Sequence, residues 1–128
     1  MTNDGLGLRP LYTLSLFSGY GGLDEGVRSV WPQCRTVAHV EVEPFAIASL
    51  VSQMEQGVLA QAPIFTDIVR FPAADFNRRL VEATGERIRV VVGGFPCQDI
   101  SYAGKGAGIT GANSGLWFAM ARIIRDVG

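Results

Sequence analysis

Short apolar, β-prone runs alternate with helical patterns along this chain, and this alternation constrains its fold more than any other feature. The runs and patterns follow one another at residues 11–17, 23–30, 35–42, 44–56, 62–68, 73–84, 87–95 and 115–127. An order of β-α-β-α-β-α-β-loop-α is typical of βαβ units, whose strands form a parallel sheet covered by helices. The sequence therefore predicts an α/β fold in one domain of residues 11–128, preceded by an arm of residues 1–10.

Apolar residues at helical spacing predict which faces of the helices turn towards the sheet. Leu23, Val27 and Val30 share one face of the first predicted helix. The run at 87–95 is the most continuously apolar, as expected of a strand that is buried on both faces. The last predicted helix has an apolar face made of Leu116, Met120, Ile123 and Val127.

Composition and charge narrow the class of protein. The chain is 48% hydrophobic and 18% charged, which indicates a buried core and not a disordered segment. Its net charge of −1 gives no support to strong duplex binding by the chain alone, because freestanding nucleic-acid binders are usually basic. Two cysteines make neither a disulfide framework nor a metal site. With no signal peptide and no run of membrane-spanning length, we expect a cytoplasmic protein with neither a metal nor a membrane partner.

Residues with functional chemistry lie at or just after the end of each of the four predicted strands. They are the glycine loop at 18–22, Glu41, Asp67 and Cys97. In doubly wound parallel sheets, ligands bind beyond the carboxyl ends of the strands, at the point where strand order reverses. These four features are therefore expected to converge at one end of the sheet.

The glycine loop lets the backbone approach a ligand closely and leads into a helix N-terminus with free N–H groups. Gly19 and Gly21 match two glycines of the dinucleotide fingerprint, but Asp24 occupies the third glycine position. An acid there would repel a pyrophosphate, which disfavours an NAD-dependent oxidoreductase and favours a cationic or zwitterionic ligand. A simple tight turn is the alternative for such a loop.

Two acids that follow strands suit a nucleoside. Glu41 comes about twenty residues after the glycine loop, where an acid accepts hydrogen bonds from ribose hydroxyls. Glu43 is an alternative for that role, unless it is a first-turn helix carboxylate. Asp67 either accepts a hydrogen bond from an adenine amino group or serves as a helix cap or turn aspartate. Together these residues indicate an adenosine pocket without a phosphate site.

Cys97 differs in context from the other cysteine of the chain. It follows a buried strand, in a loop with Pro96, Gln98 and Ser101, which favour exposure or backbone hydrogen bonding. Reaction requires the thiolate, which nearby positive charge or helix N-termini stabilise. Cys34 is expected to be an inert, buried residue.

Several segments together resemble the successive N-terminal motifs of the cytosine C5 DNA methyltransferases. The matching segments are FSGYGG (17–22), Glu41, TDI (66–68), GGFPCQDIS (93–101) and SGLWFAMARIIR (114–125). The resemblance covers residues 11–127 and implies a Rossmann-like, S-adenosylmethionine-dependent fold, with flanking helices and a partial parallel sheet of strand order 3-2-1-4. It also implies that the partner is DNA with a flipped cytosine. An enzyme of a restriction–modification system, a phage enzyme and a regulatory methylase would fit this resemblance equally. The expected location is the bacterial or phage-like cytoplasm, in association with the nucleoid.

The same resemblance implies a role for each matching residue. Cys97 would be the nucleophile that adds to C6 of cytosine, so that C5 becomes enamine-like and accepts a methyl group. Gln98 and Ser101 would contact the DNA. From its charge, Lys105 is either a contact to a substrate phosphate or a solvated loop residue. The cofactor-binding set would be Phe17, Ser18, Gly19, Gly21, Gly22, Glu41, Val42, Asp67, Ile68, Gly94, Pro96 and Leu116.

The chain departs from the family pattern in two respects, and its expected strand order gives an independent argument for a missing neighbour. Members usually continue into a Glu-Asn-Val segment, an Arg-x-Arg strand and a target recognition domain, which these 128 residues lack. Asn113 stands where the family usually has arginine. In the order 3-2-1-4 the apolar fourth strand would be an edge, which invites pairing with another chain. We therefore expect the cofactor-binding half of a catalytic domain, from a fragment, a truncated gene or a split enzyme completed by a second polypeptide.

Two other functions stay open on the sequence alone. One is methylation of cytosine C5 in RNA, because a tRNA-modifying family carries the same motifs. The other is a non-catalytic remnant of the fold that binds a cofactor or a partner.

Overall fold

A computed structural model describes residues 9–19, 21–94 and 115–128. Over these residues the chain is an α/β fold with a four-stranded, all-parallel sheet in the order β3-β2-β1-β4. The elements are β1 (Leu11–Leu16), α1 (Gly22–Val30), β2 (Cys34–Val40), α2 (Pro44–Glu55), β3 (Ile64–Phe65), α3 (Ala73–Thr84), β4 (Ile88–Gly93) and α4 (Gly115–Val127). The predicted fold class, the order of helices and strands and the strand order 3-2-1-4 are confirmed, while the predicted loop before the last helix lies outside the described residues.

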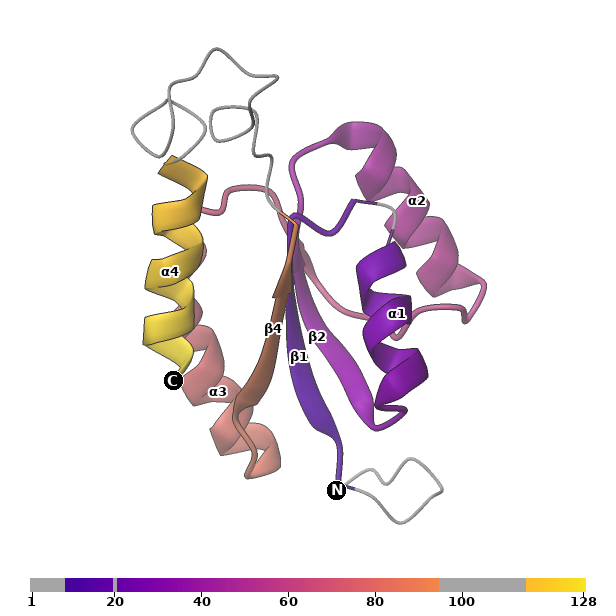
Figure 1. The fold of residues 1–128 in the computed structure, drawn as a ribbon. Helices are drawn as coiled ribbons and strands as arrows, with labels where there is room; N and C mark the ends of the chain where they lie inside the picture. The colour runs from indigo at the N-terminus through magenta and orange to yellow at the C-terminus, as the bar shows by residue number, and fades with distance from the viewer. Residues whose placement is uncertain (1–8, 20, 95–114) are drawn as a thin grey trace.

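The fold has three layers. Helices α1 and α2 lie on one face of the sheet, and α3 and α4 lie on the other (Figure 1). The predicted third strand, 62–68, is shorter than expected, because only Ile64 and Phe65 pair with β2. The Asp67 side chain then accepts the Val69 N–H at 2.9 Å, and the chain turns away from the sheet at this point.

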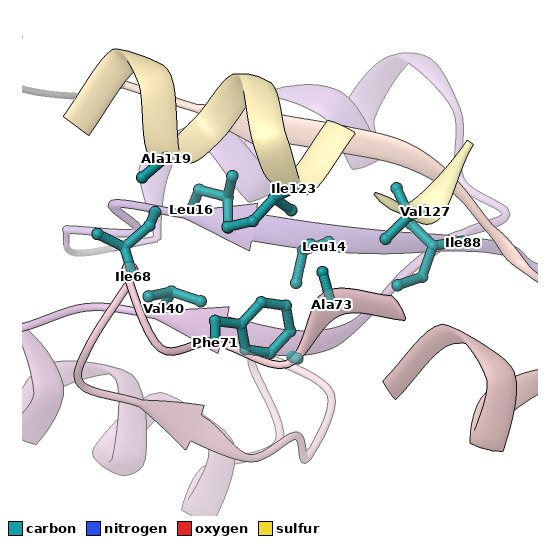
Figure 2. Close-up of a cluster of buried hydrophobic side chains, with 11 residues drawn as sticks. Leu14, Leu16, Val40, Ile68, Phe71, Ala73, Ile88, Ala119, Ile123 and Val127 are labelled. Carbon is teal, nitrogen blue, oxygen red and sulfur yellow. The ribbon is translucent and has the colours of Figure 1, made fainter. Parts of the chain in front are cut away.

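The hydrophobic core lies between the sheet and the α3/α4 layer. Leu14 and Leu16 of β1 are at most 1% exposed and pack under α4, whose Ile123 is fully buried (Figure 2). The predicted apolar face of α4 is confirmed. Its residues Ile123 and Val127 are buried, and Leu116 and Met120 are partly buried against the same cluster.

The predicted inward face of α1 is wrong for Leu23 and Val30, whereas Val27 is partly buried. Leu23 and Val30 are 48% and 66% exposed, whereas Asp24 is only 6% exposed. The reason is that Ser15 and Thr36, from β1 and β2, present hydroxyl groups that bind the Asp24 carboxylate. Because of these polar contacts, the face of α1 that includes Asp24 packs against the sheet, in place of the face that includes Leu23 and Val30.

Strand β4 pairs with β1 and with no second strand among the described residues, so the predicted edge position is confirmed. Its burial pattern is mixed: Val92 is buried, Val90 and Val91 are partly buried, and Arg89 is exposed. The prediction of a strand buried on both faces is therefore wrong for the described part of the chain. The apolar β4 has a backbone edge that can accept another strand.

The carboxyl ends of all four strands are level with one another. The pairing register places Phe65, Val40, Leu16 and Gly93 in one row across the sheet. Two hydrogen bonds continue the row: Phe17 N–H donates to the Val40 carbonyl at 2.8 Å, and Glu41 N–H donates to the Phe65 carbonyl at 2.9 Å. The segments that follow the strands are therefore held at the same end of the sheet.

Candidate functional site

The glycine loop after β1 has an unusual backbone. Phe17, Gly19 and Gly21 all have positive φ, of 54°, 54° and 84°. Glycine adopts such angles freely, but for phenylalanine a left-handed conformation costs about 1–2 kcal/mol. Strain of this kind persists where surrounding contacts fix it, and it is concentrated at functional sites. The loop is thus built to a specific shape directly beyond the sheet.

The Glu41 carboxylate binds this loop from the end of the neighbouring strand. Its Oε1 accepts a hydrogen bond from the Gly19 N–H at 2.6 Å. Its Oε2 accepts from the N–H groups of Val42 and Glu43, both at 2.9 Å. A carboxylate has about four acceptor positions, so Oε1, with one bond, keeps capacity for a further donor. The predicted convergence of the glycine loop and Glu41 is confirmed.

The structure also separates the two candidate acids after β2. Glu43 is the N-cap of α2 and accepts the Ala46 N–H at 2.6 Å, while Pro44 occupies the first turn. This is the helix-terminal role that the sequence offered as its alternative. Glu41, and not Glu43, is therefore the acid that faces the glycine loop.

Asp67 closes the turn that follows β3. Its Oδ1 accepts the N–H of Val69 at 2.9 Å and of Arg70 at 3.4 Å. Its Oδ2 lies 3.6 Å from Arg70 Nε, and both side chains are more than half exposed. Asp67 is thus a turn aspartate, as the alternative interpretation predicted, and its second oxygen, which pairs with the exposed Arg70 at 3.6 Å, keeps capacity to accept a hydrogen bond.

Apolar side chains near the strand ends differ widely in exposure. Val42 and Val69 are 72% and 67% exposed, whereas Ile68 is 8% exposed and packs in the core. Gly94 is exposed, and a Cβ added there would meet nothing within 4 Å. Of the predicted cofactor contacts, Val42 presents an open apolar surface, Gly94 leaves open space, and Ile68 faces mainly inward.

A buried polar network lies beneath the glycine loop. The Asp24 carboxylate accepts hydrogen bonds from Ser15 Oγ at 2.7 Å and Thr36 Oγ1 at 2.8 Å. Ser15 Oγ is 2.9 Å from Ser18 Oγ, which is 2.9 Å from His39 Nδ1. Since Ser15 Oγ donates its hydrogen to Asp24, the Ser18 hydroxyl donates towards Ser15, whose carbonyl oxygen is also within reach at 3.1 Å, and His39 Nδ1–H donates to Ser18. The network runs from α1 through β1 and the loop to β2.

His39 is the innermost member of this network. Its side chain is fully buried, and within the described residues its Nε2 is the buried side-chain nitrogen or oxygen without a hydrogen-bond partner. Burial lowers the pKa of His39 below its ordinary value of 6.5, although the Asp24 carboxylate 4.0 Å away acts in the opposite direction. The imidazole is therefore neutral at pH 7.

Sequence reasoning missed most of this network. It assigned Ser18 to the cofactor and Asp24 to the repulsion of a pyrophosphate, but both side chains are buried and bind other protein groups. A ligand contact from Ser18 would therefore come from its backbone. The available signal was the spacing of Thr13 and Ser15, which alternate with leucines in β1 and so place polar groups on the α1 face.

Other predicted site residues are placed as follows. Gly22 is exposed at the start of α1, and Leu116 packs partly buried against the core. Pro96, Cys97, Gln98, Ser101 and Lys105 lie outside the described residues, as do residues 1–8 of the predicted arm.

Residues 9–19, 21–94 and 115–128 contain no group of three or more His, Cys, Asp or Glu side chains that could hold a metal ion. No helix in this part of the chain is both long and apolar enough to cross a membrane.

A cavity of about 310 Å³ lies elsewhere, on the α1 face of the sheet. Its lining includes Pro10, Gln33 and Cys34, which precede or begin β1 and β2. It is therefore centred towards the opposite end of the strands from Glu41 and the glycine loop.

Comparison with known proteins gives a consistent match. Residues 11–127 match the family model described as C-5 cytosine-specific DNA methylase. The chain is 31% identical over 114 residues to the Type II methyltransferase M.CviJI of Paramecium bursaria Chlorella virus IL3A, covering 89% of this chain and 27% of that protein. It is 37% identical over 103 residues to M2.BsuMI of Bacillus subtilis (strain 168), covering 80% of this chain and 22% of that protein.

A shorter relative is the Type II methyltransferase M.AquIA of Picosynechococcus sp., which is 30% identical over 115 residues. The match covers 88% of this chain and 43% of that protein. The chain thus spans 22% to 43% of the length of these curated relatives.

Proposed function

Because the chain belongs to the C-5 cytosine-specific DNA methylase family, we propose that it carries the S-adenosylmethionine-binding half and the nucleophile of an enzyme that methylates cytosine C5 in DNA. The observation that carries this proposal is the Glu41 carboxylate, fixed by three backbone N–H groups beside a strained glycine loop at the carboxyl ends of the strands. This arrangement offers a preorganised acceptor for a ribose hydroxyl.

The residues present fit S-adenosylmethionine. Glu41 Oε1 keeps acceptor capacity, and the half-exposed Asp67 carboxylate can accept from an amino group through Oδ2. The exposed Val42 supports a flat ring, and the open space at Gly94 admits close approach. When bound, the cofactor supplies an electrophilic methyl group on a cationic sulfonium. No lysine or arginine faces the Glu41 carboxylate in the contacts of the described residues, which suits a cationic ligand.

Cys97 would perform the covalent chemistry. Its thiolate sulfur bonds to C6 of the flipped cytosine, which moves electron density to C5 and makes that carbon nucleophilic. After C5 is methylated, a base removes the C5 proton and the electron pair re-forms the double bond as the thiolate leaves. Gln98, Ser101 and Lys105 would contact the DNA around the target base. The family membership supports these roles, because all four residues lie within the matched segment 11–127.

The edge of β4 would be completed by the rest of the methyltransferase domain. Its backbone has no second partner strand within the described residues, and a groove lined by Arg87, Val91 and Ile124 runs beside it. We propose that the remaining motifs come from a further part of the polypeptide or from a second one. The relatives differ in the length of the polypeptide outside the matched part, since that part is 22% of M2.BsuMI and 43% of M.AquIA.

Covalent trapping tests the nucleophile. The protein, with and without the polypeptide that supplies the remaining motifs, is incubated with S-adenosylmethionine and DNA that contains 5-fluorocytosine. Fluorine at C5 prevents the final elimination, so a denaturation-resistant protein–DNA adduct accumulates. We expect the wild type to form it in the completed enzyme, and Cys97→Ser to form none. Equal trapping by Cys97→Ser would show that the nucleophile is another residue, and trapping on RNA but not DNA would reassign the substrate.

A further inference from the structure

One face of α4 is directed at the turn after β3. Ala119, Arg122 and Ile123 occupy positions i, i+3 and i+4, which share a helix face. Ala119 and Ile123 are buried in the same cluster as Ile68, and Figure 2 shows the three side chains near one another. The helix that contacts the core therefore also contacts the segment bearing Asp67.

Arg122 binds the backbone of that turn. Its NH2 group donates to the carbonyl oxygens of Ile68 at 3.1 Å, Val69 at 3.3 Å and Phe71 at 3.4 Å. Its NH1 group lies 3.3 Å from Asp126, one helical turn further along α4. The Arg122 side chain is only 32% exposed, which strengthens its hydrogen bonds relative to those of a solvated arginine.

The turn is thus held from two sides. Asp67 Oδ1 binds its N–H groups at Val69 and Arg70, and Arg122 binds its carbonyl groups. With Oδ1 committed to the turn, the direction of Oδ2 follows from the turn geometry. Any loosening of the turn therefore changes where Asp67 Oδ2 points.

We propose that Arg122 is a positioning residue that fixes the Asp67 turn, so that Asp67 selects the amino group of the adenine ring of the cofactor. This inference rests on the proposed function, because it assigns Asp67 Oδ2 to the adenine. Arg122 acts through the backbone and does not touch the ligand. Lysine cannot replace it fully, because a single ammonium lacks the planar donors that serve the carbonyls and Asp126 together.

The test compares two ligands that differ at the amino group. S-adenosylhomocysteine and its deaminated analogue S-inosylhomocysteine are titrated calorimetrically into the protein in its native assembly. The inosine ring has an oxygen where adenine has the amino group, and a carboxylate repels it. We expect the wild type to prefer the adenosine ligand, and Arg122→Met to reduce that preference by about tenfold, as the loss of one well-aligned hydrogen bond would. Arg122→Lys should give an intermediate ratio.

Arg125→Met is the matched control, since Arg125 lies on the same helix, is 75% exposed and binds Asp126 alone among the described contacts. It should leave the preference unchanged. If Arg122→Met lowers the urea midpoint but keeps the wild-type preference, Arg122 has only a structural role and the inference fails. If the wild type binds neither ligand, the proposed function fails as well, so the two failures are distinguishable.

Discussion

Among single residues, Glu41 connects the most parts of the site. Its carboxylate accepts N–H groups from the glycine loop and from the start of the segment leading to α2, at 2.6–2.9 Å. Removing it would leave three backbone donors without their acceptor, and each lost hydrogen bond costs roughly 0.5–1.5 kcal/mol. The same side chain also provides the proposed acceptor for the ribose, so it affects both folding and binding.

We therefore predict different outcomes for two Glu41 variants. Glu41→Ala should weaken S-adenosylmethionine binding by at least about tenfold and lower the unfolding temperature. Glu41→Gln keeps one acceptor oxygen and should retain more of both properties. Calorimetry and thermal unfolding measure the two effects. Glu43→Gln serves as the control, because it removes the charge of the α2 cap without touching the loop, and wild-type affinity in Glu41→Ala would refute the assignment.

Residue-level prediction worked where a residue follows a strand in a parallel sheet. Glu41 and Asp67 could be placed from the element order alone, because the strand ends are level. Ser18, His39 and Arg122 could not be assigned in this way. Their partners come from other elements, at sequence separations of 21 and about 50 residues, and no local pattern reports such contacts.

Among the elements, helices α4 and α1 show when the spacing of apolar residues predicts the buried face of a helix and when it does not. The face of α4 was predictable because it packs against leucines of β1, so apolar pattern and environment agree. The face of α1 was not, because the sheet beneath it carries Ser15, Thr36 and His39. A hydrophobic pattern indicates which residues prefer burial, but a buried carboxylate with two hydroxyl donors can outweigh it.

Packing between β4 and α4 gives an element-scale prediction. A Cβ added at Gly93 would lie 2.9 Å from Met120 Cε and 3.1 Å from its Sδ, so this glycine permits close approach of the helix. Gly93→Ala should destabilise the protein by about 1 kcal/mol, limited by the flexibility of the methionine, and Met120→Ala should remove that penalty. Urea unfolding of the two single variants and the double variant measures the coupling.

Gly26 in α1 is the matched control for this substitution. A Cβ there would meet nothing within 4 Å. Since glycine is a poor helix former, Gly26→Ala should stabilise the protein by up to about 1 kcal/mol. Destabilisation of similar size at both positions would mean that close packing at Gly93 is not the cause.

At the scale of the whole molecule, His39 gives stability a defined pH dependence. It is the only histidine of the chain, and burial lowers its pKa below the value of 6.5 that it has when unfolded. Between these two pKa values the unfolded state binds a proton that the folded state does not. The contribution of His39 to the free energy of unfolding is therefore fully present above pH 6.5. It falls as the pH drops towards the folded pKa, by at most about 1.4 kcal/mol per pH unit.

Urea unfolding at pH 7.5, 6.5 and 5.5 measures this decline. His39→Asn should flatten the decline, since asparagine does not titrate but offers an amide donor near the position of Nδ1. Thr13→Val, which removes a buried hydroxyl outside the network, should keep the wild-type slope. Parallel profiles for the wild type and His39→Asn would assign the decline to other groups. The network that shapes the glycine loop would then be insensitive to the charge of His39.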